Sequence, residues 1–286
     1  MPSPKVPVVL DNKGLPEGFL QHVKDFETIK VSMPEDGILL ITLNRPEKLN
    51  AFDEHMIREM RSVVWKANFD DRVRVVIITG AGRAFCAGRD IMGLDYENNL
   101  ATSGYRAYVR ANHEMFDDLE ALEKPVIAAV NGICAGGGVE MSVACDFRMA
   151  AAGAEFLLPE NQLGVIPASG ACSRMIQLIG IGRLKEMVMA ALPVTAEEAL
   201  RIGLVNRVFA PENLMEGTLA FARRLLTLAP QAMGMGKHII NMCQNVDTET
   251  GRLLERLGQS VLIRTEDNKE GMLAFREKRK PKFKGR

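Results

Sequence analysis

Two glutamates occur in surroundings where carboxylates are uncommon. Glu140 is flanked by aliphatic residues, and Glu160 follows a proline in the largely apolar segment LPENQLGVIP, residues 158–167. Burial raises the pKa of a carboxyl group and suits it to proton transfer near neutral pH. An ion pair with a nearby lysine or arginine would explain either glutamate equally well. The two residues are therefore candidates for general acid–base chemistry, and a structural role stays open.

Two glycine-containing loops could supply a second kind of chemistry. Residues 136–138 are three consecutive glycines after the apolar run 126–130, and Ala87-Gly88 follows the apolar run 73–79. Glycine lets a ligand approach the main chain closely, and the first turn of a helix has unpaired N–H groups. Each loop could direct one backbone N–H at the same carbonyl oxygen and so stabilise an oxyanion. The alternative is a pair of tight turns whose glycines serve only packing.

The segments around these residues predict an α/β fold. The runs 73–79 and 126–130 are continuously apolar, which is typical of strands buried on both faces. Residues 26–33 and 37–43 predict a hairpin, and Asp53 is a candidate N-cap for a helix. Further helices are predicted over 105–122, 169–179, 184–192, 195–202, 211–228, 231–245, 249–264 and 265–278. Strands alternating with helices, followed by helices alone, indicate a layered α/β core with a helical C-terminal part.

The composition predicts a protein with a substantial buried core. The chain has 286 residues, is 47% hydrophobic and 25% charged, and has no net charge, so no overall field would attract nucleic acid. Its five cysteines lack disulfide spacing, which favours reduced thiols in a cytoplasmic compartment. No apolar run approaches the ~18 residues that a membrane span needs. We divide the chain into an extended N-terminal arm (1–25), a core (26–205) and a C-terminal helical region (206–286).

Four other motifs give little functional signal. GAGRAF at 80–85 begins like a dinucleotide-binding loop but lacks the third glycine. The four histidines are isolated from one another and from the cysteines, so we expect no metal site. Ser169 lies in PASGA, which is not a nucleophile elbow. The basic tail REKRKPKFKGR (276–286) is either a solvated end or a segment that reaches phosphates on a ligand.

Five segments, taken together, resemble the enoyl-CoA hydratase/isomerase (crotonase) superfamily. They are NRPEKLNAF (44–52), AFCAGRDI (84–91), VNGICAGGGVEMSVACDFRMAAAGAEFLLPENQLGVIP (130–167), GLVNRVF (203–209) and GMLAFREKRKPKF (271–283). The order and spacing of the two glycine loops match those of the family. The resemblance covers nearly the whole chain, from about residue 26 to residue 283.

The resemblance implies a fold and an assembly. The fold would be α/β, a crotonase-like superhelix of ββα turns with a C-terminal helical region used in trimerisation. The usual assembly in the family is a homotrimer or a dimer of trimers. The substrate would be an acyl-CoA thioester. Coenzyme A would then be part of the substrate, and we expect no separate cofactor and no nucleic acid or membrane partner.

The resemblance also implies roles for particular residues. Arg89 and Gly137 would donate the two backbone N–H groups of an oxyanion hole, and a backbone donor tolerates an arginine side chain. Glu140 and Glu160 would be the catalytic carboxylates. The binding site for the substrate and its coenzyme A would be lined by Lys48, Leu49, Asn50, Ala87, Gly88, Asp90, Ile91 and Gly136, with Phe275 and Lys278 near the adenosine phosphates.

Both carboxylates occur in the hydratases of the family, whereas isomerases and several other members keep one or replace them. The pair therefore predicts an enoyl-CoA hydratase of fatty acid metabolism, which adds water syn across the α,β double bond through an enolate. Which glutamate is base and which is acid is left open. Isomerisation, hydration with aldehyde loss, and thioester or C–C hydrolysis are the alternatives within the family. A non-catalytic protein that binds nucleic acid or a partner, and a trimeric scaffold, are the alternatives outside it.

Departures from the family pattern leave the acyl group open. The segment after VIP is commonly glycine-rich, whereas this chain has ASGACSRM at 168–175. Asn161 and Gln162 follow the second glutamate, where many hydratases have an aliphatic residue, and this predicts a more polar pocket. Three tyrosines in the variable region after the first loop either lie at the surface or face an aromatic or oxygenated acyl group: Tyr96, Tyr105 and Tyr108.

Overall fold

Two β-sheets form the centre of the protein. A computed structural model describes residues 26–91 and 100–286, so the predicted N-terminal arm and Tyr96 lie outside the described residues. In spatial order, the larger sheet of the described chain contains β1 (Ile29–Glu35), β2 (Gly37–Leu43), β3 (Val73–Gly80), β5 (Val126–Val130), β7 (Phe147–Ala151) and β10 (Arg207–Phe209). The smaller sheet contains β4 (Ala84–Cys86), β6 (Ile133–Ala135), β8 (Glu155–Leu157) and β9 (Val194–Thr195).

Consecutive ββα units build the core. In each unit a first strand joins the larger sheet, a short second strand joins the smaller sheet, and a helix follows. The units are β3–β4–α2, β5–β6–α3 and β7–β8–α4, where α2 is Thr102–Ala121, α3 is Gly137–Ala144 and α4 is Ala171–Ala190. β3, β5 and β7 are parallel neighbours, and so are β4, β6 and β8. The predicted superhelix of ββα turns is therefore confirmed.

Helices cover both faces of the larger sheet. Val76 and Ile78 of β3 pack in one cluster with residues of α1 (Glu54–Phe69) and α2. Val75 and Ile77 of the same strand pack in a second cluster with residues of α6 (Leu214–Leu226) on the opposite face. Because successive side chains of a strand point to opposite faces, a strand covered on both sides must be apolar throughout. This is why the middle of β3, residues 75–78, is apolar on both faces.

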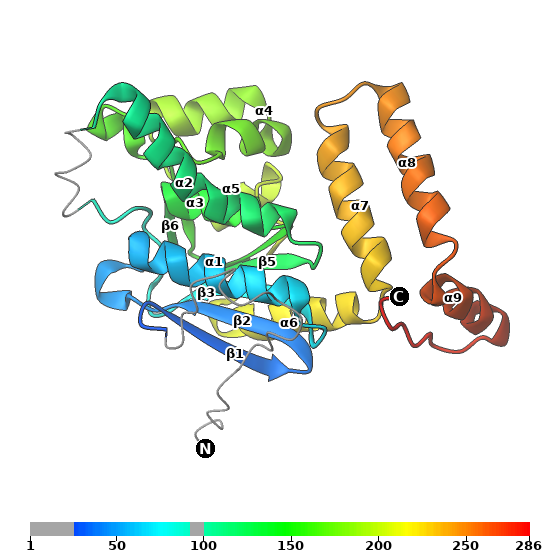
Figure 1. The fold of residues 1–286 in the computed structure, drawn as a ribbon. Helices are drawn as coiled ribbons and strands as arrows, with labels where there is room; N and C mark the ends of the chain where they lie inside the picture. Colours follow the sequence, from blue (N-terminus) through cyan, green and yellow to red (C-terminus); the bar gives the residue numbers. More distant parts are fainter. Residues whose placement is uncertain (1–25, 92–99) are drawn as a thin grey trace, which may run out of the picture.

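The C-terminal helices extend away from the core. Figure 1 shows α7 and α8 as a pair beside the sheets, with α9 at their lower end. β10 lies beyond residue 205 but pairs with β7, so the larger sheet continues past the predicted start of the C-terminal region. No helix in the described residues is long and apolar enough to cross a membrane. The remaining helices are α5 (Ala196–Arg201), α7 (Pro230–Cys243), α8 (Thr248–Leu262), α9 (Glu266–Glu277), η1 (Pro46–Lys48), η3 (Glu160–Leu163) and η4 (Pro211–Asn213).

Two local features show how the sequence sets these boundaries. Asp53 is the N-cap of α1, and its side chain accepts a hydrogen bond from Met56 N at 2.9 Å, as predicted. The helices predicted over 169–179 and 184–192 are joined as α4, and Gly180 interrupts the helical geometry between them with φ +75°. Glycine adopts this left-handed conformation without the steric cost of a Cβ, so it allows the kink.

Candidate active site

The first glycine loop is held by a short parallel bridge to Phe52. Phe52 N donates to Gly88 O at 2.8 Å, and Asp90 N donates to Phe52 O at 2.8 Å. In a parallel bridge of this kind the flanking residues bond to the partner strand, and the central residue directs its own N–H and C=O the other way. The N–H of Arg89 is therefore turned away from Phe52.

The two glycine loops touch at Gly88 and Gly137. A Cβ added at Gly88, which has φ +93°, would lie 2.9 Å from Ala135 O and 3.1 Å from Gly137 N. A Cβ added at Gly137 would lie 2.6 Å from the ring of Phe52. Gly137 is the first residue of α3, where an N–H has no intrahelical acceptor. The structure thus brings the backbone segments that carry the predicted donors, Arg89 and Gly137, into contact.

The loop before α1 is bonded to the first glycine loop and to the segment just before that loop. The amide of the buried Asn50 donates to two main-chain oxygens of segment 81–84, at 2.9 and 2.8 Å. Lys48 Nζ and Arg45 Nη2 contact Asp90 Oδ2 at 2.8 and 2.9 Å. Asn50 and Asp90 therefore fix the loop through their own hydrogen bonds and ion pairs, and Lys48 is the exposed member of the group.

Glu140 lies on α3, one turn after the glycines, and is almost completely buried. Its Oε1 accepts hydrogen bonds from Ser169 N at 2.6 Å and from Ala171 N at 3.2 Å. Burial raises the pKa of Glu140, although these two N–H groups and the positive charge of Arg174 act in the opposite direction. Hydrogen bonds from two amides favour the ionised carboxylate. Glu140 is thus a buried carboxylate whose charge is supported by backbone donors.

Glu160 begins η3 and faces the same glycine turn from the other side. Its Oε1 lies 2.9 Å from the position that a Cβ of Gly136 would occupy, and Gly136 O accepts the backbone N–H of Glu140 at 3.2 Å. Burial raises the pKa of Glu160 to about 7, and the negative charge of Glu140 adds to this rise, although the backbone N–H of Glu160 opposes it. Within the described residues, its buried Oε2 has no hydrogen-bond partner. The two glutamates therefore lie close enough for the charge of Glu140 to act on Glu160, and the pKa of each is raised by burial.

The other predicted contact residues lie in two separate places. Ala87 N donates to Leu49 O at 3.0 Å, and Ile91 is exposed at the end of the first loop. Phe275 and Lys278 lie at the end of α9, where Phe275 is 84% exposed. Figure 1 shows α9 well away from α3 in the same chain. A single copy of the chain therefore does not bring α9 to the glutamates.

The residues that set the chain apart from the family pattern have identifiable contacts. Tyr108 of α2 hydrogen-bonds to the guanidinium of Arg89, which also lies 5.2 Å from the centre of the Tyr108 ring. Asn161 is exposed, and its amide donates to Met189 O at 2.7 Å. Tyr105 is 40% exposed. Tyr108 thus contacts the first glycine loop through the side chain of Arg89.

Sequence reasoning missed several residues that build this site. Phe52 supports both glycine loops, yet only its neighbours at 48–50 were predicted to contribute. The amides of Ser169 and Ala171 give no signal in a sequence, because every residue except proline has an N–H. Cys172 feels the negative charges of both glutamates, which add to the effect of burial in raising its pKa. Its place in the unusual segment 168–175 was the available clue.

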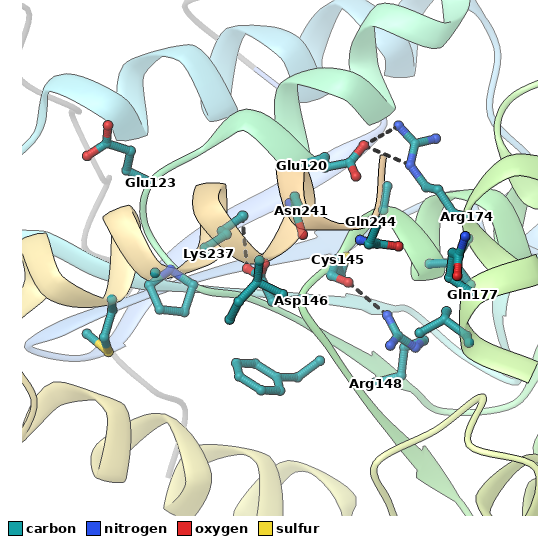
Figure 2. A pocket seen from close by; sticks show the side chains of 18 of the residues that line it. Glu120, Glu123, Cys145, Asp146, Arg148, Arg174, Gln177, Lys237, Asn241 and Gln244 are labelled. Carbon is teal, nitrogen blue, oxygen red and sulfur yellow. Dashed lines mark hydrogen bonds and ion pairs between the residues drawn. The ribbon is translucent and has the colours of Figure 1, made fainter. Parts of the chain in front are cut away.

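A cavity of about 760 Å³ lies at the other end of α3, apart from the two glutamates. Figure 2 shows its wall, where Lys237 Nζ contacts Asp146 Oδ2 at 2.9 Å and Arg174 bonds to Glu120. Among the described residues there is no cluster of histidine, cysteine, aspartate or glutamate side chains that could hold a metal ion.

Comparison with known proteins agrees with this architecture. A family model described as enoyl-CoA hydratase/isomerase matches residues 34–286. The chain belongs to the enoyl-CoA hydratase/isomerase family. It is 39% identical over 247 residues to the short-chain-enoyl-CoA hydratase of Clostridium acetobutylicum, covering 86% of this chain and 94% of that protein.

Two further relatives extend the match to another sequence and to a solved structure. The crotonyl-CoA hydratase of Syntrophomonas wolfei is 38% identical over 250 residues, covering 87% of this chain and 95% of that protein. The crystal structure of an enoyl-CoA hydratase from Bacillus anthracis has a TM-score of 0.85 at 36% identity, covering 91% of this chain and all of that one. The family assignment thus holds for both the sequence and the fold.

Replacing Gly88 with alanine should destabilise the protein by more than backbone strain alone. The control is Gly153→Ala, because Gly153 has φ +86° but no atom within 4 Å of an added Cβ. We expect Gly153→Ala to cost about 1 kcal/mol of unfolding free energy, and Gly88→Ala about 1–3 kcal/mol more, because its Cβ meets backbone atoms. Urea denaturation at equal protein concentration measures both. Equal losses would show that the loops separate without cost.

Replacing Glu160 with glutamine should change how stability depends on pH. The folded-state pKa of Glu160 is raised to about 7 from 4.5, so the wild-type protein loses stability as the pH rises through this interval. Glutamine does not titrate, so Glu160→Gln should be more stable relative to wild type at pH 8 than at pH 5. Denaturation at both values tests this, with Glu155→Gln, a change at an exposed glutamate of β8, as the baseline. A difference no larger than that baseline contradicts the burial of the charged form.

Proposed function

We propose that the protein is an enoyl-CoA hydratase that adds water syn across the α,β double bond of an acyl-CoA thioester. The observation that carries this proposal is a pair of carboxylates, buried Glu140 and half-buried Glu160, close enough for the charge of one to act on the other, beside the glycine turn that contacts the first glycine loop. Hydration of a conjugated thioester needs a proton acceptor for water, a proton donor for Cα and a site for the charge on the thioester oxygen. The site has candidates for all three.

The backbone N–H groups of Arg89 and Gly137 would bind the thioester oxygen. When water attacks Cβ, negative charge moves to this oxygen, and preorganised donors are worth most where charge develops. The contact between Gly88 and Gly137 holds the two segments at a fixed separation, so little reorganisation is needed during the reaction. The side chain of Arg89 points to Tyr108 and leaves the donor role to the main chain.

The two glutamates would take different roles. Glu140, whose carboxylate accepts two backbone hydrogen bonds, would remove a proton from water as the new Cβ–O bond forms. Glu160, whose pKa is raised to about 7, would give its proton to Cα as the enolate collapses. Water thus supplies oxygen to Cβ, and one proton moves onto each of Cα and Glu140. Both glutamates lie beside one glycine turn, which supports addition from one face.

The remaining features fit an acyl-CoA enzyme that assembles from several copies. The loops 48–50 and 87–91 would line the path of coenzyme A, which is part of the substrate. Phe275 and Lys278 would reach that path from a neighbouring copy, because α9 lies away from α3 in its own chain. A homotrimer, or a dimer of trimers, would satisfy this arrangement. Five free cysteines support a reducing compartment such as the cytoplasm.

The purified protein should hydrate at least one enoyl-CoA. We expect the absorbance of the conjugated thioester to fall with one member of a panel from crotonyl-CoA to cinnamoyl-CoA and alicyclic thioesters, and the product to gain the mass of one water. Glu140→Gln and Glu160→Gln should each lower kcat by about 10²–10⁴-fold, because each removes one proton-transfer group. Glu155→Gln, on the surface of β8, should retain the wild-type rate.

The product separates this proposal from its alternatives. An isomer of unchanged mass, free coenzyme A or an aldehyde would identify another enolate reaction of the family. Absence of turnover across the whole panel would contradict the hydratase function. A near-wild-type rate in either glutamine variant would contradict the two-carboxylate mechanism. Circular dichroism must show that Glu140→Gln and Glu160→Gln keep the wild-type fold, so that their rates report on catalysis.

The exposed apolar stripe of α8 should mediate assembly. Leu253, Leu257 and Val261 are four residues apart and are each about half exposed, at 48%, 55% and 57%. Such a stripe on a soluble helix marks a protein contact surface. We expect Leu257→Asp to reduce the mass measured by light scattering from that of a trimer or hexamer toward that of one chain. Gln259→Asp adds the same charge on another face and should leave the mass unchanged. An unchanged mass in both variants would place the interface elsewhere.

A further inference from the structure

Arg174 joins α4 to α2 through its whole guanidinium group. Its Nε and Nη2 donate to Glu120 Oε2 at 2.9 and 2.6 Å, and Nη2 also contacts Asp117 Oδ1 at 2.7 Å. Figure 2 shows the Arg174 side chain directed at Glu120 across the space between the two helices. The side chain of Arg174 is only 15% exposed, whereas its partners Glu120 and Asp117 are 37% and 62% exposed, so the guanidinium is the buried end of this network. Removing it would leave a charge near α2 without its partner.

The same guanidinium packs against the turn that holds Glu140. Its Nη1 donates to Ser169 O at 3.2 Å. Gly170, the next residue, has φ +116°, and a Cβ there would lie 1.9 Å from Arg174 Nη1. The arginine therefore occupies the space beside the Gly170 backbone and limits how this turn can move. The N–H groups on both sides of Gly170 are those that bind Glu140 Oε1.

We propose that Arg174 is a positioning residue for Glu140. Ion pairs with Glu120 and Asp117 fix the guanidinium, the guanidinium fixes the turn at Gly170, and the turn fixes the carboxylate through two N–H groups. This inference rests on the proposed hydratase function, since that reaction needs the carboxylate of Glu140 to be aimed at a water molecule. Misplacing a reacting group by about 1 Å can cost on the order of 100-fold in rate.

Arg174 also affects the charge state of Glu140. The titratable groups around Glu140 in the described chain are Arg174 and Cys172 of α4 and Glu160 of η3. Of these only Arg174 carries a positive charge, and it lowers the pKa of Glu140 against the effect of burial. Removing that charge makes the ionised carboxylate less stable, so the pKa of Glu140 should rise. The acidic limb of the kcat profile should then move to higher pH.

The test compares Arg174→Met and Arg174→Lys with a matched control. Arg183→Met changes an exposed arginine of the same helix that pairs with Glu186 and Glu198, away from the turn at Gly170. We expect Arg174→Met to lower kcat by about 10- to 100-fold with KM changed far less, because substrate contacts remain. Arg174→Lys keeps the charge but cannot make all the hydrogen bonds, so its rate should lie between. Arg183→Met should keep the wild-type rate.

A second readout does not depend on turnover. The carboxyl carbon signal of Glu140, identified by its absence in Glu140→Gln, can be titrated by NMR in each variant. Glu140 should titrate at higher pH in Arg174→Met than in wild type, Arg174→Lys or Arg183→Met. Because no substrate is present, this measurement keeps its meaning even if no enoyl-CoA is hydrated and the proposed function fails.

The rate and the pH at which Glu140 titrates together decide whether Arg174 positions Glu140. The positioning role is supported if Arg174→Met loses rate and raises the pH at which Glu140 titrates, and if Arg174→Lys recovers part of the rate. If the pKa of Glu140 and the rate in Arg174→Met equal those in Arg183→Met, the positioning role is overturned. A rate loss without a change in titration, not recovered by lysine, also overturns it, because general destabilisation would explain the loss. If Arg174→Met does not fold, Glu120→Gln weakens the same network and its rate is measured instead: a lowered kcat with KM changed far less supports the positioning role, and a rate equal to that of Arg183→Met overturns it.

Discussion

The site depends on the close approach of two main-chain segments at Gly88 and Gly137. There is no room between them for a Cβ, so the separation of the two loops is set by backbone atoms and not by side chains that could change rotamer. Phe52 stabilises this contact, because its main chain bonds to the loop at Gly88 and its ring packs against the loop at Gly137. An oxyanion hole needs donors that do not reorganise during the reaction, so such a contact would suit the donor roles predicted for Arg89 and Gly137.

The two carboxylates illustrate how neighbouring groups can differ in what acts on their charge. Glu140 is the more deeply buried, yet two amides and a nearby guanidinium support its negative charge. Glu160 is less buried but has an oxygen without a partner in the described structure, and it lies in the field of the first carboxylate. At Glu140, hydrogen bonds from two amides and the charge of Arg174 oppose the effect of burial on the pKa, whereas at Glu160 the charge of Glu140 adds to that effect.

Much of the fold could be read from the sequence, because its signals are local. The apolar runs 73–79 and 126–130 became central strands, and Asp53 capped the helix that follows it. The paired glutamates and glycine loops were recognisable by residue type and order. The roles of Arg89 and Gly137 as donors remain predictions, since a backbone N–H has no sequence signature. The support for Glu140 was missed because Arg174 meets residues 54 and 57 positions earlier in the chain.

Helix α2 links the two halves of the site over its length. Near its start, Tyr108 binds the side chain of Arg89 and so braces the first glycine loop. Near its end, Asp117 and Glu120 bind Arg174, which supports the turn that holds Glu140. A shift of this one helix would therefore disturb the first glycine loop and the turn that holds Glu140 together. Because α2 contacts both elements through side chains, its position is a feature through which changes in sequence outside the glycine loops can alter the site.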